Sequence, residues 1–223
     1  MIPWVHLGTA QVPDGGGELR LIQRGAEFAI MLDRAELMNS RRAGSEEALA
    51  TLACAKLGKR PKPHLLIGGL GMGFTLRAAL AVLGPDARVT VAELVPEVIV
   101  WARGPMTPIF GDSLSDKRVI VREIDVGRLI REGKSAYDAI LIDVDNGPEG
   151  LSRKANGRLY DAGGLDATHA ALKPGGVLAV WSAAPDASFT KRLKRAGFAV
   201  EEVGARSLGT RGARHVIWLA VRP

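Results

Sequence analysis

The sequence contains a single cysteine, Cys54, and no run of about eighteen consecutive apolar residues. One cysteine excludes an intrachain disulfide, and the apolar helical pattern around Cys54 favours a buried structural thiol over a nucleophile. Without a long apolar run, no membrane-spanning helix is expected. The first six residues lack the charged-then-apolar layout of a secretory signal, so we expect a cytoplasmic protein.

Basic residues outnumber acidic ones, which gives a net charge of +6 and a pI of about 9.8. This balance permits an anionic partner such as RNA, DNA or an acidic metabolite. The densest basic set falls on one predicted helix and is typical of a solvated helix face: Lys191, Arg192, Lys194 and Arg195. No zinc-finger spacing or aromatic-interleaved basic motif accompanies it, so nucleic acid is a secondary hypothesis and no bound metal is expected.

The 223 residues suffice for one α/β core with a small appendage. Residues 1–57 form an N-terminal segment, in which strands predicted over 18–23 and 27–32 suggest a hairpin. A helix is predicted after them, with Ser45 as its N-cap. A Gly/Pro-rich stretch then marks a linker, so residues 58–223 are predicted to form a separate nucleoside-binding catalytic domain.

Strands and helices alternate from residue 64 onward. This alternation predicts a seven-stranded, mostly parallel sheet with helices on both faces. The last two predicted strands, 198–203 and 215–221, follow each other without an intervening helix. They are therefore predicted to form a hairpin that places one antiparallel strand in the sheet.

A glycine-rich loop, Gly69-Leu70-Gly71-Met72-Gly73, separates the first strand of this region from a helix. Ligands of open α/β sheets bind at the carboxyl ends of strands, where glycine permits tight turns and close approach. The spacing Gly-x-Gly-x-Gly differs from the dinucleotide fingerprint, and no Gly-Lys-Ser/Thr follows it. The loop therefore favours a nucleoside without a pyrophosphate, with a purely structural turn as the alternative.

Two acids end the next two predicted strands. Glu93 stands twenty residues after Gly73, where a carboxylate can accept hydrogen bonds from both ribose hydroxyls; the alternative is a solvated carboxylate. Asp125 ends the third strand and could accept the exocyclic amine of adenine. It could equally be the N-cap of the helix that follows.

A third acid, Asp143, ends the fourth predicted strand and is expected to face the same crevice. A carboxylate there can orient an amine nucleophile, accept its proton or hold a sulfonium by charge. Asp145, two residues later in a glycine- and proline-containing loop, is a second catalytic candidate. The alternative for Asp145 is an aspartate that forms a turn.

Several motifs occur in order along the chain and together resemble the spermidine synthase family of the class I S-adenosylmethionine-dependent methyltransferase fold. The resemblance covers about residues 64–182. The motifs that carry it are Ile67-Gly68-Gly69-Leu70-Gly71-Met72-Gly73, Ala92-Glu93-Leu94, Ser115-Asp116-Lys117-Arg118-Val119, Asp125-Val126, Tyr137-Asp138-Ala139-Ile140-Leu141-Ile142-Asp143, Leu159-Tyr160 and Leu172-Lys173-Pro174-Gly175-Gly176-Val177-Leu178.

The resemblance implies a Rossmann-like fold and a site for an S-adenosylmethionine-type donor. The residues implied in donor binding are Gly69, Gly71, Gly73, Glu93, Leu94, Asp125, Val126 and Asp143. Asp143 would also assist the acceptor. The family transfers an aminopropyl group from decarboxylated S-adenosylmethionine to putrescine, and its members are often dimers, so small-molecule partners and a homodimer are expected.

The chain departs from the family at the positions that face the polyamine. Gly71 stands where the family has an aspartate that recognises the amine tail of the donor. The usual aspartate-serine-serine-aspartate-proline becomes residues 143–148, and leucine-aspartate-glycine-x-x-glutamine becomes residues 32–37. The usual tyrosine-histidine-glutamate becomes Gly44-Ser45-Glu46. We therefore expect a retained nucleoside site and an altered acceptor site.

Four functions follow as hypotheses. The first is a spermidine synthase-like transferase that moves an aminopropyl or methyl group from decarboxylated or ordinary S-adenosylmethionine to an unidentified acceptor, such as an amine. The second is a methyltransferase acting on a small molecule or nucleic acid. The third is a non-catalytic nucleoside- or RNA-binding domain. A nicotinamide oxidoreductase is fourth and is disfavoured by the glycine spacing.

Overall fold

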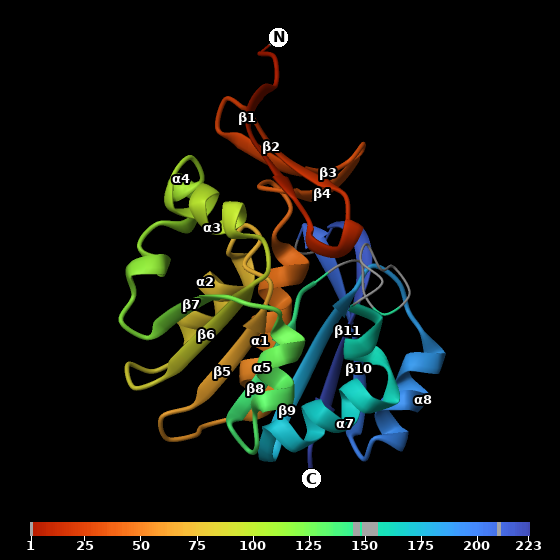
Figure 1. The fold of residues 1–223 in the computed structure, drawn as a ribbon. Coiled ribbons are helices and arrows are strands. Elements are labelled where there is room, and N and C mark those ends of the chain that lie inside the picture. Colours follow the sequence, from red (N-terminus) through yellow and green to blue (C-terminus); the bar gives the residue numbers. More distant parts are fainter. Residues whose placement is uncertain (1, 145–147, 149–155, 209–210) are drawn as a thin grey trace.

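The protein folds around two β-sheets (Figure 1). The structure, a computed structural model, describes residues 2–144, 148, 156–208 and 211–223. A four-stranded sheet has the order β1-β2-β3-β4, and a seven-stranded sheet has the order β10-β11-β9-β8-β5-β6-β7. The smaller sheet lies above one end of the strands of the larger sheet, at the end of the molecule that holds the N-terminus (Figure 1).

The small sheet is antiparallel throughout. Its strands are β1 (Val5–Gln11), β2 (Glu18–Arg24), β3 (Glu27–Leu32) and β4 (Ala35–Asn39). The predicted hairpin is confirmed as β2 and β3, joined by a turn in which Gly25 has a φ of 59°. The two edge strands, β1 and β4, were not predicted, because neither shows an alternating apolar pattern.

The large sheet is parallel except at one strand. Its strands are β5 (His64–Gly68), β6 (Arg88–Glu93), β7 (Val119–Glu123), β8 (Tyr137–Ile142), β9 (Leu172–Ser182), β10 (Ala199–Leu208) and β11 (Arg211–Val221). Strand β11 pairs antiparallel with both β10 and β9. The predicted fold class, a seven-stranded mostly parallel sheet with one antiparallel strand, is confirmed.

Helices cover both faces of the large sheet, as predicted. They are α1 (Gly44–Leu57), α2 (Phe74–Val82), α3 (Pro96–Arg103), α4 (Thr107–Phe110), α5 (Val126–Glu132), α6 (Gly157–Tyr160), α7 (Ala162–Ala171) and α8 (Ala187–Arg195), with short 3₁₀ turns η1 (Pro13–Gly15) and η2 (Ser113–Ser115). None of the helices described here has the length and apolarity of a membrane span.

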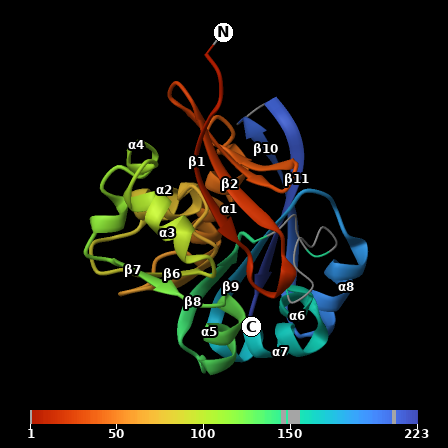
Figure 2. The same ribbon diagram turned by 45° about the horizontal axis from the view of Figure 1, so that its top comes forward.

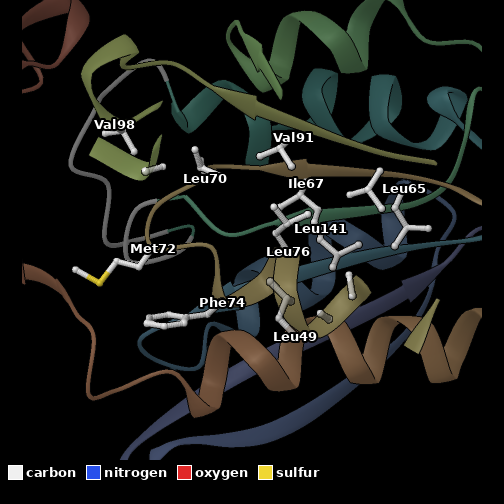
Figure 3. Packing of buried hydrophobic residues seen from close by; sticks show 14 of the residues in the cluster. Leu49, Leu65, Ile67, Leu70, Met72, Phe74, Leu76, Val91, Val98 and Leu141 are labelled. Atoms are coloured by element: carbon white, nitrogen blue, oxygen red, sulfur yellow. The ribbon is translucent and has the colours of Figure 1, made fainter. Parts of the chain in front are cut away.

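Alternation along the strands produces two apolar cores. In β5, Leu65 and Ile67 belong to the core that α1, α2 and α3 cover, whereas Leu66 belongs to the core under α5, α7 and α8. Figure 3 shows the first core, where Leu49 and Leu76 approach the strands.

The start of α1 differs from the prediction. The helix begins at Gly44 with Ala43 as its N-cap, so Ser45 lies within the first turn and the predicted cap is wrong. Ser45 instead donates a hydrogen bond to Glu46 Oε2 at 2.7 Å. Helix α1 packs against α2, β9 and β10. The division of the chain after residue 57 stays a prediction.

Cys54 is half-buried on α1, and burial raises the pKa of its thiol to about 11. Such a thiol is almost fully protonated at neutral pH and is a poor nucleophile. The structural role predicted for Cys54 agrees with this environment.

Candidate functional site

A cavity of about 180 Å³ lies between the small sheet and the carboxyl ends of strands in the large sheet. That volume far exceeds the space of one water molecule, about 30 Å³, so the cavity can hold a small molecule. Figure 2 shows the small sheet lying across this end of the molecule. The lining residues are Val12, Gly16, Leu19, Ile30, Leu32, Leu37, Met38, Glu46, Gly69, Gly71, Ala92, Glu93, Leu94, Val95, Val98, Ile124, Asp125, Val126, Asp143, Val144, Asn156 and Trp181.

The order of the strands determines the layout of the cavity. Strands β9, β8, β5 and β6 are consecutive neighbours in the sheet. Their ends therefore place Trp181, Asp143, the glycine loop and Glu93 in a row, with neighbouring strands about 4.8 Å apart. The cavity has a Glu93 end and a Trp181 end, with Asp143 and the loop between them.

The glycine loop requires glycine at its turns. Gly69, Gly71 and Gly73 have φ values of 88°, 48° and 75°, in the left-handed region. A Cβ on Gly69 would lie 2.7 Å from the Asp143 backbone oxygen, so the loop and the end of β8 touch. Gly69 and Gly71 line the cavity, whereas Gly73 caps α2 and faces the Phe110 ring.

Glu93 is 7% exposed and ties its strand to the glycine loop. Its Oε2 accepts a hydrogen bond from the Leu70 backbone N–H at 2.9 Å, and its Oε1 accepts one from Val95 N–H, also at 2.9 Å. Burial raises the pKa of the Glu93 carboxyl, while these backbone N–H groups favour its ionised form. The backbone N–H groups of Leu94 and Gly71 favour the ionised carboxylate as well, and both Glu93 and Leu94 line the cavity.

Asp125 is confirmed as an N-cap, while its predicted contact with adenine stays a prediction. Its Oδ1 accepts a hydrogen bond from the Arg128 backbone N–H at 3.1 Å, which makes Asp125 the N-cap of α5. Asp125 and the adjacent Val126 also line the cavity, beyond Glu93. Capping therefore holds this carboxylate in place without removing it from the cavity wall.

Asp143 follows β8 and lies at the centre of the cavity. The Thr75 hydroxyl donates a hydrogen bond to Asp143 Oδ2 at 2.6 Å, and Thr75 belongs to the first turn of α2. Burial and the negative charge of Glu46 raise the pKa of the Asp143 carboxyl to about 7, against the effect of the Thr75 bond. Asp143 can therefore exchange a proton near neutral pH. The second catalytic candidate, Asp145, lies outside the described residues.

Glu46, in the first turn of α1, was not among the predicted site residues. It lines the cavity, and burial raises the pKa of its carboxyl. Its backbone oxygen lies 3.3 Å from the Thr75 hydroxyl, so Thr75 links Glu46 with Asp143. A signal was present in the sequence, because Glu46 is the last residue of Gly44-Ser45-Glu46 and matches the glutamate of the tyrosine-histidine-glutamate motif.

Met38, on β4, fills the space next to Gly71. A Cβ on Gly71 would lie 2.7 Å from Met38 Sδ. A thioether therefore stands where a side chain at position 71 would reach. Nothing in the sequence pattern indicated this contact, because it joins the small sheet to a loop 33 positions later.

Trp181, near the end of β9, was also missed. Its ring centroid lies 4.8 Å from that of His215 on β11, at an interplanar angle of 33°. Trp181 Nε1 is buried without a hydrogen-bond partner among the described residues. His215 supports the indole, which therefore forms a fixed wall at one end of the cavity.

The charges around the cavity have one sign. The lining contains four acids, namely Glu46, Glu93, Asp125 and Asp143. Within the part of the chain that the structure describes, the lining contains no lysine, arginine or histidine. Cationic ligands are therefore favoured over anionic ones.

Comparisons with known proteins agree with this geometry. No protein-family model matches the chain. It is 32% identical over 150 residues to polyamine aminopropyltransferase 1 of Streptomyces coelicolor, covering 64% of the chain and 27% of that protein. It is 30% identical over 168 residues to polyamine aminopropyltransferase of Corynebacterium efficiens, covering 74% of the chain and 31% of that protein. The chain thus matches less than a third of the length of these relatives.

Solved structures define the class of the fold. Human methyltransferase-like protein 13 in complex with SAH superposes with a TM-score of 0.62 at 23% identity, covering 79% of this chain and 81% of that one. The chain therefore has the class I S-adenosylmethionine-dependent methyltransferase fold.

A spermidine synthase in complex with the transition state analogue AdoDATO superposes with a TM-score of 0.76 at 19% identity, covering 98% of this chain and 74% of that one. The predicted resemblance is confirmed: the chain is spermidine synthase-like in fold and sequence, at an identity low enough to mark it as divergent.

Proposed function

We propose that the protein is a transferase that moves an alkyl group, preferably aminopropyl, from an S-adenosyl sulfonium donor to an amine. The observation that carries this proposal is that the four acids line one and the same cavity. Glu93 and Asp125 lie at one end of it, and Asp143 and Glu46 lie at its middle. The names of the two curated relatives support the transfer of an aminopropyl group.

The Glu93 end suits a nucleoside. Glu93 would accept the ribose hydroxyls, and Asp125 would face the adenine amine between the apolar side chains of Leu94 and Val126. Gly69 and Gly71 line the cavity and carry no side chain, so a ligand can approach their backbone. The proposed nucleoside site therefore rests on residues at the ends of β5, β6 and β7 and not on the glycine loop alone.

The acidic lining favours the decarboxylated donor. Decarboxylated S-adenosylmethionine carries a sulfonium and an ammonium but no carboxylate. Ordinary S-adenosylmethionine would place a carboxylate in a cavity whose described lining has acids and no basic side chain. Repulsion between like charges in a partly buried site weakens binding, so the aminopropyl donor is preferred.

The reaction requires positioning and one proton acceptor. The donor supplies a carbon made electrophilic by the neighbouring sulfonium, which leaves as a neutral thioether. The amine lone pair forms the new N–C bond while the C–S bond electrons pass to sulfur. Asp143 Oδ accepts the proton that the amine loses, and its pKa of about 7 suits this exchange at neutral pH. Thr75 holds the carboxylate in place through its 2.6 Å hydrogen bond.

Methyl transfer is the second candidate, on one specific observation. Met38 fills the space beside Gly71, where the family's aspartate would recognise the amine tail of the donor. Loss of that acid removes one reason for the protein to prefer the decarboxylated donor. The methyltransferase-like structure in complex with SAH has the same fold.

Calorimetric titration separates the candidates. We expect methylthioadenosine and decarboxylated S-adenosylmethionine to bind, the latter more tightly than ordinary S-adenosylmethionine. Tighter binding of ordinary S-adenosylmethionine would support methyl transfer. Binding of NAD alone would exclude both forms of group transfer.

Further features stay proposals of the same kind. We propose that residues 1–57 and 58–223 are an N-terminal segment and a catalytic domain, and that Gly73 and Asp145 act with the site residues described above. We also propose a cytoplasmic homodimer with small-molecule donor and acceptor as partners. Sedimentation analysis would test the dimer.

A further inference from the structure

We propose that the acceptor is an amine with one ammonium group and an apolar body, and not a diamine. The inference rests on the proposed function and adds the substrate class. Its basis is the contrast between the acids at the centre of the cavity and the apolar walls around its Trp181 end.

The position of the acceptor follows from the order of the strands. A nucleoside at Glu93 and Asp125 occupies the β6 side of the glycine loop. An acceptor must then approach from the other side, where β8 and β9 end with Asp143 and Trp181. Asp143 meets the reacting nitrogen first, and the rest of the acceptor extends toward the indole.

The acids at the centre form one site for one cation. Glu46 and Asp143 both line the cavity, and Thr75 lies between them. Burial raises the pKa of both carboxyls, and the negative charge of Glu46 raises that of Asp143 further, so an ionised Glu46 disfavours ionisation of Asp143. The pair therefore tends to share one proton and to carry one negative charge, which matches one ammonium group.

Apart from its four acids, the described lining of the cavity has one polar side chain, that of Asn156, and otherwise consists of glycines and apolar side chains. Trp181 is backed by the His215 ring at 4.8 Å. The strands of the small sheet cover the cavity with aliphatic side chains and one thioether, from Leu19, Ile30, Leu32, Leu37 and Met38. A hydrocarbon chain or ring gains free energy against such a surface.

A second ammonium would lose its hydration at this wall. A cation can interact with an indole face, but that attraction is smaller than the free-energy cost of removing an unpaired ammonium from water. In addition, one face of the Trp181 ring already packs against His215. A diamine is therefore disfavoured relative to a monoamine of equal length.

The test compares 1-aminohexane with 1,6-diaminohexane, which differ only in the distal ammonium. Protein saturated with methylthioadenosine is titrated with each amine in a calorimeter. We expect 1-aminohexane to bind at least tenfold more tightly than the diamine. Equal or tighter binding of the diamine, or binding of neither amine, would overturn the inference while leaving the nucleoside site standing.

Variants at the indole sharpen the test. Trp181→Ala should lower the affinity for 1-aminohexane at least tenfold and leave methylthioadenosine affinity unchanged, whereas Trp181→Phe should restore most of the loss. Trp181→Glu should shift the preference toward the diamine. Trp4→Ala, at a partly exposed tryptophan that does not line the cavity, is the matched control and should change neither affinity.

Two further results decide whether the role of the indole and the proposed function stand. Retained methylthioadenosine binding shows that a variant is folded, so unchanged affinity of Trp181→Ala for 1-aminohexane would overturn the role of the indole. If the parent protein does not bind methylthioadenosine, the proposed function fails, and the acceptor inference fails with it.

Discussion

The two ends of the cavity are built from different parts of the chain and resemble the spermidine synthase family to different degrees. The Glu93 end comes from β6, the glycine loop and the start of α5, where the family motifs occur in order. The Trp181 end comes from β9, and the small sheet, where the motifs are altered, lines the cavity as well. The comparison supports the proposal that donor recognition is retained while the acceptor site has diverged.

The largest expected effect is at the centre, where the two ends meet. Asp143→Asn should lower turnover by about 10²–10⁴-fold, because the amide cannot accept the proton from the amine. The variant keeps an oxygen for the Thr75 hydroxyl, so methylthioadenosine affinity should stay within about threefold, roughly 0.7 kcal/mol. Steady-state kinetics and calorimetry together check both statements.

Asp161→Asn is the matched control for this change. Asp161 caps α7 by accepting a hydrogen bond from Gly164 N–H at 2.8 Å, and asparagine caps helices equally well. It does not line the cavity, so its turnover should equal that of the parent protein. Full turnover in Asp143→Asn would show that another group accepts the proton.

The next effect tests the donor end alone. Glu93→Ala should lower methylthioadenosine affinity at least tenfold, about 1.4 kcal/mol, because the acceptor for the ribose hydroxyls is lost. Glu123 is paired with Glu93 in register on the neighbouring strand β7 but is exposed. Glu123→Ala is therefore the control and should bind the nucleoside normally. Equal affinities of the two variants would refute the ribose assignment.

A smaller effect tests the contact between the small sheet and the glycine loop. Gly71→Asp should lower the free energy of unfolding by about 1–3 kcal/mol, because the new side chain meets Met38 at a positive φ. Met38→Ala in the same chain should recover part of this loss, while Met38→Ala alone is the control. Thermal unfolding of the three variants checks the coupling, and purely additive changes would argue against the contact.

The smallest effect concerns pH. The pKa of Asp143 is raised in the folded protein, so the folded state binds an extra proton above the unfolded pKa, and stability falls as pH rises toward 7. Asp143→Asn removes this dependence. It should raise the midpoint of thermal unfolding by a few degrees at pH 8 and not at pH 4. Parallel curves for the two proteins would contradict the raised pKa.

The sequence predicted the parts of the fold that local patterns determine. The sheet, its single antiparallel strand and the boundaries of β3 and α3 follow from apolar periodicity and from proline and glycine at element ends. The strands β1 and β4 could not be predicted, because their pairing depends on neighbours in the small sheet. The Ser45 cap was wrong because α1 begins at Gly44 with Ala43 as its N-cap, and the Ser45 hydroxyl binds Glu46 instead.

The Glu93 end of the cavity was predictable and the Trp181 end was not. Glu93 ends β6, while Asp125 comes two residues after the end of β7 and Asp143 directly after the end of β8, so their convergence follows from the parallel sheet. Glu46, Met38 and Trp181 reach the cavity through tertiary packing between segments far apart in the chain. Only Glu46 left a trace in the sequence, as the retained glutamate of an altered motif.

A crystal structure of the protein with methylthioadenosine would test the central claim most directly. The account predicts that the ribose hydroxyls lie within hydrogen-bonding distance of the Glu93 carboxylate, with the sulfur directed toward Asp143 and the Trp181 end open for an amine. A nucleoside bound at the Trp181 end, or outside the cavity, would contradict it.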